Sequence, residues 1–106
     1  MGRFAIVAFR PLPGKEDKLM AVTKDHLPIL RSQGLVTDRE SYVMRASDGT
    51  IIEVFEWKSS KAIEEAHKNP AVLAMWQKYS EACEYVTLSS LKEFSNLFAE
   101  FEPVNP

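Results

Sequence analysis

The segment 3–10 (RFAIVAFR) carries an apolar side chain at every position between its two arginines. A run of β-branched, aromatic and small residues that ends at a proline predicts a β-strand. Because successive side chains of a strand point to opposite faces, both faces of this strand are apolar and both need a cover. This requirement limits the folds that the chain can adopt.

The next segments predict a helix and a hairpin. Residues 15–33 have apolar side chains at intervals of three and four, typical of an amphipathic helix, which we expect Pro28 to kink or interrupt near residues 24–28 and Gly34 to end. Residues 35–46 suit a strand, and the pair Asp48-Gly49 is a strong signal for a hairpin turn. Residues 51–57 (IIEVFEW) alternate and predict the returning strand.

The second half repeats the order of helix and strand. Ser59-Ser60 predicts the cap of a helical segment that reaches His67, and Asn69-Pro70 predicts the start of a helix over 70–84. Residues 85–88 suit a short strand, and the capping-box pattern of residues 90–93 predicts one or two helical turns. Residues 97–103 alternate with period two, which favours a final strand over a continued helix.

The order β-α-β-β-α-β predicts an α+β fold, a ferredoxin-like antiparallel sheet with helices on one face, in a single domain over residues 1–106. Helices on one face leave the other face of the apolar strands uncovered. We expect a second copy of the sheet to cover it in a homodimer, with the strand over 97–103 contributing to the contact between subunits.

Composition narrows the partners and the compartment. The 13 basic and 15 acidic residues are interleaved, so no basic face is available for nucleic acid or for an anionic membrane. No segment approaches the ~20 apolar residues of a membrane helix. Cys83 is the only cysteine, which excludes an internal disulfide and favours a small buried residue over a nucleophile. We expect a cytoplasmic protein.

Candidate chemistry centres on two histidines, because no metal-binding, phosphate-binding or nucleophile motif is present. His67 is a candidate general base for a phenol or quinol, since imidazole titrates near neutral pH; the alternative is a histidine at a helix end with a purely structural role. His26 falls on the apolar stripe of the first helix and suits a core or pocket wall. We expect no protein-built metal site.

Several aromatic and acidic residues could complete a pocket. Glu53 and Glu56 lie on opposite faces of their strand, so the inward one needs a partner, either an arginine or a histidine that it would orient. The larger aromatic side chains either line a cavity for flat ligands or belong to an ordinary core; they are Tyr42, Trp57, Trp76 and Tyr79.

The passage from Val54 to Ala62 (VFEWKSSKA), followed by Ala66-His67 and Asn69-Pro70, resembles the antibiotic-biosynthesis-monooxygenase-like family of the dimeric α+β barrel superfamily. The tail over 97–103 is similar to the C-terminal strand of that family. The resemblance spans most of the chain in element order, through short motifs. It implies a homodimer with one pocket per subunit between sheet and helices. Members include cofactor-free oxygenases of quinols and polycyclic phenols, and haem-degrading enzymes.

The resemblance implies that His67 corresponds to the helix histidine of the quinol-oxidising branch. The first strand lacks the asparagine of the haem-degrading branch. We therefore expect a monooxygenase that acts on an aromatic or quinol molecule without metal or flavin. His67 is the expected base, and the substrate would contact Trp76, Tyr79, Tyr42, Trp57 and His26. The alternatives are a non-catalytic dimeric module that binds a small apolar ligand, and haem binding through His67 or His26.

Overall fold

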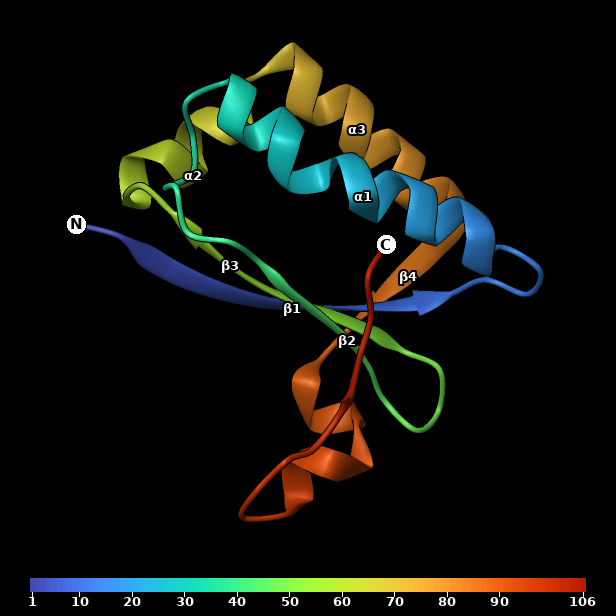
Figure 1. Cartoon of the computed structure of the whole chain (residues 1–106). Coiled ribbons are helices and arrows are strands. Elements are labelled where there is room, and N and C mark those ends of the chain that lie inside the picture. Colours follow the sequence, from blue (N-terminus) through green and yellow to red (C-terminus); the bar gives the residue numbers. More distant parts are fainter.

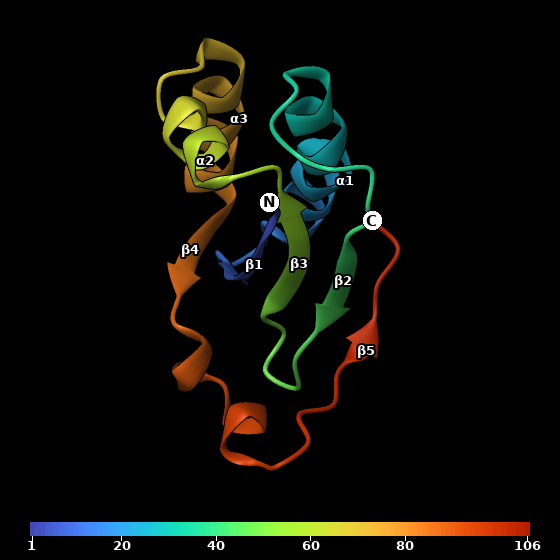
Figure 2. The same cartoon turned by 90° about the vertical axis from the view of Figure 1, so that its left-hand side faces the viewer.

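A computed structural model describes all residues from 1 to 106. The chain forms an α+β fold in which one layer of helices covers one face of a five-stranded antiparallel sheet (Figures 1 and 2). The main elements are β1 (Arg3–Pro11), α1 (Glu16–Ser32), β2 (Tyr42–Arg45), β3 (Ile51–Trp57), α2 (Ser60–Ala66), α3 (Pro70–Ala82), β4 (Cys83–Val86) and β5 (Glu102–Pro103). Two short 3₁₀ turns, η1 (Leu88–Ser90) and η2 (Lys92–Ser95), precede β5.

The strand order β4-β1-β3-β2-β5 confirms the ferredoxin-like arrangement expected from the sequence. The long strands β1 and β3 pair in the centre of the sheet, with Val7 opposite Glu53. The hairpin between β2 and β3 turns at Gly49, whose positive φ of 92° suits a residue without Cβ, and Oδ1 of Asp48 accepts a hydrogen bond from the Thr50 amide. The register set by this hairpin fixes which side chains face the helices.

The starts of α2 and α3 follow capping residues, as the sequence predicts. The Ser59 hydroxyl accepts a hydrogen bond from the Ala62 amide at the start of α2. At the start of α3, Oδ1 of Asn69 accepts from the amides of Ala71 and Val72, and Pro70 occupies the first helical position.

Replacing Asn69 with alanine should lower the free energy of unfolding by about 1 kcal/mol, because two amides of the first turn lose their acceptor. Asn69→Asp is the matched control, since its carboxylate accepts the same bonds and favours the positive end of the helix dipole. Urea unfolding followed by circular dichroism measures both. Equal destabilisation by the two substitutions would contradict the capping role.

Several predicted elements before the C-terminal segment differ from the structure. Helix α1 runs through Pro28 without a break; the carbonyl of Lys24 loses its helical donor there, but both residues are exposed and water can replace the donor. The strand expected over 35–46 is confined to β2, because the loop before it is held by Arg39, which donates to Glu56. The strand expected over 85–88 is β4, two residues earlier, since the extended backbone begins at Cys83.

The C-terminal segment departs furthest from the prediction. The strand expected over 97–103 is reduced to β5, which pairs with β2 of the same chain at Met44 and Arg45. The capping box expected at residues 90–93 does not form, because the Glu93 carboxylate accepts a hydrogen bond from the Ser47 amide on the β2–β3 hairpin instead. This contact ties the segment to the sheet below the helices (Figure 1).

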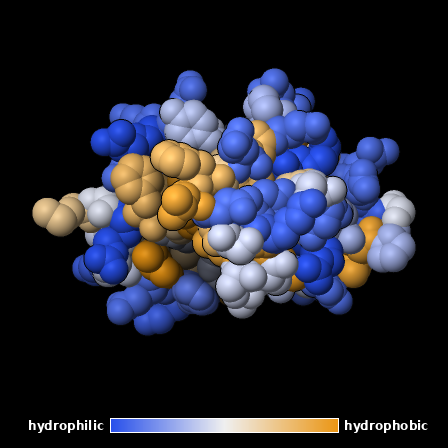
Figure 3. Space-filling model, turned by 90° about the horizontal axis from the view of Figure 1, so that it is seen from below, coloured by the Kyte–Doolittle hydropathy of each residue, from blue (hydrophilic) through white to orange (hydrophobic).

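The two faces of the sheet are covered to different extents. Between sheet and helices lies a core of 17 buried apolar residues. On the other face the C-terminal segment covers a cluster of only four buried residues, Ala8, Ala46, Ile52 and Leu91. The rest of that face carries exposed apolar side chains, Phe4, Ile6 and Tyr42, and apolar atoms gather on this side of the surface (Figure 3). The chain itself therefore covers only part of the second apolar face of its sheet.

Candidate functional site

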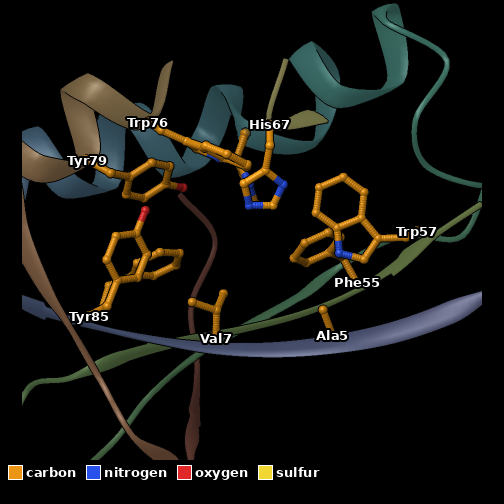
Figure 4. A pocket seen from close by; sticks show the side chains of 10 residues that line it. Ala5, Val7, Phe55, Trp57, His67, Trp76, Tyr79 and Tyr85 are labelled. Carbon is orange, nitrogen blue, oxygen red and sulfur yellow. The ribbon is translucent and has the colours of Figure 1, made fainter. Parts of the chain in front are cut away.

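A cavity of about 390 Å³ opens between the sheet and the helices. Eight of its ten lining residues are hydrophobic. The strands contribute Ala5, Val7, Phe9, Phe55, Trp57 and Tyr85, and the helices with their ends contribute His26, His67, Trp76 and Tyr79 (Figure 4). Tyr79 and Tyr85 stand at one end and Phe55 and Trp57 at the other, with His67 between them (Figure 4). This aromatic lining suits a flat, mostly apolar ligand.

His67 is positioned by the end of α2, where it is the C-terminal capping residue. Its Nδ1 lies 2.8 Å from the carbonyl oxygen of Ile63. A carbonyl oxygen can only accept, so Nδ1 carries a proton, and in the neutral ring Nε2 is bare. The ring also packs edge-on against Trp76, with centroids 5.0 Å apart. His67 therefore presents an oriented, basic nitrogen at the cavity.

His26 projects from α1 toward the sheet and forms a buried pair with Glu53 of β3. Nδ1 of His26 lies 2.5 Å from Oε1 of Glu53, and both side chains are almost completely buried. The ring of His26 meets Phe55 and Tyr79 edge to face, at centroid distances of 5.1 and 5.4 Å. Oε2 of Glu53 has no hydrogen-bond partner although it is fully enclosed. A buried carboxylate thus orients one of the two histidines that line the cavity.

The two tyrosines at the end of the cavity are neutral hydrogen-bonding groups. The Tyr79 hydroxyl donates to Oγ1 of Thr23, at 3.2 Å, and burial raises the pKa of Tyr79 far above its usual range. Burial likewise raises the pKa of Tyr85 to about 12. Both side chains therefore keep their protons at neutral pH. Neither tyrosine can serve there as a base, but the Tyr85 hydroxyl can donate a hydrogen bond to a ligand oxygen.

Four of the five residues expected to contact substrate lie around this cavity, namely His26, Trp57, Trp76 and Tyr79, together with the expected base His67. Tyr42 does not. It pairs with Val54 on the opposite face of the sheet and is 71% exposed there. The expectation for Tyr42 is corrected because the register of β2 turns Val43 toward the helices, with Glu53 as its partner. Whether the remaining residues bind a substrate stays a prediction.

The structure also separates the two glutamates of β3. Glu53 faces the helices, and its partner is His26 rather than an arginine. Glu56 faces the other side, where its carboxylate accepts hydrogen bonds from Thr37 and Arg39. The sequence left this choice open. The alternation of IIEVFEW allows either face, and the position of α1 over the sheet decides it.

Cys83 lies in the core beside the cavity and not in it. Its Sγ donates to the Tyr79 carbonyl oxygen, and burial raises the pKa of the Cys83 thiol to about 11. The thiolate is the reactive form. At pH 8 we therefore expect native Cys83 to react with a thiol reagent about two orders of magnitude more slowly than the same residue in urea. Equal rates in the native and unfolded protein would contradict this assignment.

No three side chains of the metal-ligating types (His, Cys, Asp, Glu) come together. Every helix is too short or too polar to cross a membrane.

Comparison with solved structures shows a likeness in fold. Rv0793 from Mycobacterium tuberculosis has a similar structure, with a TM-score of 0.66 over 81% of this chain and 89% of that chain. The two sequences are 18% identical, so the likeness shows a shared small α+β fold and nothing of the chemistry. No protein-family model and no curated protein matches the sequence.

The sequence did not identify half of the cavity wall. Ala5, Val7 and Phe9 occupy every second position of β1, and Phe55 lies two positions after Glu53, on the same face of β3. The period of two identifies each set as sharing a face, but only the placement of the helices shows which face encloses a cavity. Tyr85 lies both in the strand expected over 85–88 and in β4, and here too only the packing of the helices shows that its side chain borders the cavity.

Proposed function

We propose that this protein is a homodimeric oxygenase of the antibiotic-biosynthesis-monooxygenase type, which oxidises a flat hydroxylated aromatic or quinol molecule without a metal or flavin. The observation that carries the proposal is the oriented His67 in an apolar, aromatic-walled cavity. Nε2 of the neutral ring is free to accept a proton, and the cavity is of the size that small ligands occupy. The resemblance of the segment 54–70 to that family adds to this argument.

In the proposed reaction His67 takes the proton of a ring hydroxyl, and the resulting anion is electron-rich enough to pass an electron to O₂. For a phenol, O₂ then oxidises the ring to the quinone. One oxygen atom forms the new carbonyl group and the other leaves as water, so the substrate supplies all four electrons. The aromatic walls would hold the ring plane and keep bulk water from the anion.

The homodimer is part of the same proposal. The exposed apolar face of the sheet carries Phe4, Ile6 and Tyr42, and apolar surface of this kind marks an interaction site. Each copy has the same face, so a two-fold contact covers both at once. The C-terminal segment lies on that side of the sheet (Figure 1). Its exposed Leu97 and Phe98 would extend the contact.

Oxygen uptake by the purified protein with a panel of naphthols, anthrols and quinols tests the proposed activity. We expect consumption of O₂ with a bicyclic or tricyclic substrate and formation of the corresponding quinone in equal amount. No uptake with any of them would remove the oxygenase. If a panel member then raised the melting temperature, the same cavity would belong to a binding module without catalysis. A Soret band shift on addition of haem would support haem binding instead.

A further inference from the structure

We infer that the two histidines of the cavity have opposite roles: His67 accepts a proton from the ligand, and Nε2 of His26, set by Glu53, donates a hydrogen bond to a second ligand oxygen. The inference rests on the proposed function, because the ligand is the aromatic substrate of the same cavity. It narrows the substrate class to flat molecules that carry both a hydroxyl group and a carbonyl group or second oxygen acceptor.

The protons of the buried pair can be counted. One proton lies between Nδ1 of His26 and Oε1 of Glu53, since two acceptors would not approach to 2.5 Å. If the pair holds that proton alone, it has a net charge of minus one and Nε2 is bare. If it holds a second proton, it has no net charge.

Burial favours the form without net charge. Glu53 is fully buried and His26 is 4% exposed, and no lysine or arginine forms an ion pair with either. The other groups against the ring of His26 are Phe55 and the neutral hydroxyl-bearing ring of Tyr79. An uncompensated charge in such a place is strongly disfavoured. The pair therefore holds the second proton.

That second proton belongs on Nε2 of His26. The only other free position is Oε2 of Glu53, where an O–H group would have no acceptor within reach. A proton on Oε2 would also leave an uncharged N–H···O contact between His26 and Glu53 at 2.5 Å, which is shorter than the usual range of about 2.7–3.2 Å for such bonds. With the proton on Nε2, the short contact is a shared or charge-assisted hydrogen bond, which is expected to be short.

Nε2 of His26 is the atom that meets the ligand. This nitrogen has no hydrogen-bond partner in the protein, and it is not fully enclosed. Because His26 lines the cavity, a ligand there can reach Nε2. His67 presents the opposite character at the same cavity, because the Ile63 carbonyl fixes its proton on Nδ1. A ligand with a hydroxyl toward His67 and an oxygen acceptor toward His26 satisfies both rings.

Nitrogen-15 NMR of the protein labelled in its histidines tests the proton count directly. At pH 8 we expect Nε2 of His26 to carry a proton, because Nδ1 shares its proton with the buried Glu53, and we expect Nε2 of His67 to be bare, because the Ile63 carbonyl holds the ring proton on Nδ1. A bare Nε2 at His26 would overturn the inference. This measurement needs no substrate and no variant.

Ligand binding measured by calorimetry tests the consequence. The probe is 6-hydroxy-1-tetralone, and the matched control is 5,6,7,8-tetrahydro-2-naphthol, which lacks the carbonyl group. We expect the carbonyl to tighten binding about five- to tenfold, as one hydrogen bond does. The double variant His26→Phe/Glu53→Leu removes the pair without leaving a buried charge, and should bind both molecules equally. Equal binding by the unaltered protein, or a carbonyl preference that survives in the double variant, would refute the assignment.

The two proposals can fail separately. A carbonyl preference that depends on His26, in a protein that consumes no oxygen with any substrate, leaves the hydrogen-bond donor in place and removes the oxygenase. If the protein consumes oxygen but Nε2 of His26 is bare, the oxygenase stands and the hydrogen-bond donor is removed.

Discussion

Replacing His67 with alanine should lower kcat/KM for oxygen uptake with a quinol or naphthol about 100- to 10,000-fold, the usual contribution of a positioned general base. The loss should fall on the chemical step, because the aromatic walls that would hold the ring are unchanged. His67→Gln is the sharper variant. Its side-chain amide can still donate to the Ile63 carbonyl, but it cannot take up a proton, so we expect the same loss of rate.

The fold should survive both substitutions. His67 is exposed at the end of α2, and its hydrogen bond is made within its own helix, so the free energy of unfolding should change by no more than about 1 kcal/mol. Lys68→Ala is the neighbouring control, an exposed residue outside the cavity, and should retain full activity. Added imidazole should restore part of the rate in His67→Ala. A variant that keeps more than a tenth of the rate would exclude His67 as the base.

The sequence predicts the local structure of this chain better than its contacts. The bounds of β3 are as expected because its alternation is clear and Asp48-Gly49 fixes the turn before it. The starts of α2 and α3 are as expected because Ser59 and Asn69 act on amides within three residues of themselves. Such signals are complete within a few residues and need no knowledge of the rest of the fold.

The site depends on contacts that no local pattern contains. Glu53 and His26 are 27 positions apart and meet only because α1 crosses β3. Glu93 shows the reverse case, since a good local pattern for a capping box is overridden by the amide of Ser47, which lies 46 positions away. Tyr42 lies on the face away from the cavity because the pairing of β2 with β3 places it opposite Val54. Each difference arises from tertiary placement rather than from propensity.

Replacing Ile6 with glutamate should convert the proposed homodimer to a monomer at micromolar concentration. Ile6 lies near the centre of the exposed sheet face, opposite Val54 on the neighbouring strand. Two-fold symmetry would bring one new carboxylate from each subunit into the same apolar contact, so two like charges would have to be buried together. The cost of several kcal/mol corresponds to more than about a hundredfold in the dissociation constant.

Leu73→Glu on α3 is the matched control, because Leu73 is 46% exposed and Ile6 is 47% exposed. Both substitutions place a charge on an exposed aliphatic residue, but only Ile6 belongs to the sheet face. For the unaltered protein and for Leu73→Glu, light scattering should measure twice the chain mass of 12.0 kDa. For Ile6→Glu it should measure the mass of a single chain. A monomeric unaltered protein, or equal behaviour of the two variants, would contradict the face-to-face dimer. The cavity lies on the other side of the sheet, so His67 should keep its contact with Ile63 in the monomer. Any loss of activity in the monomer would therefore show that the second subunit helps to close the site.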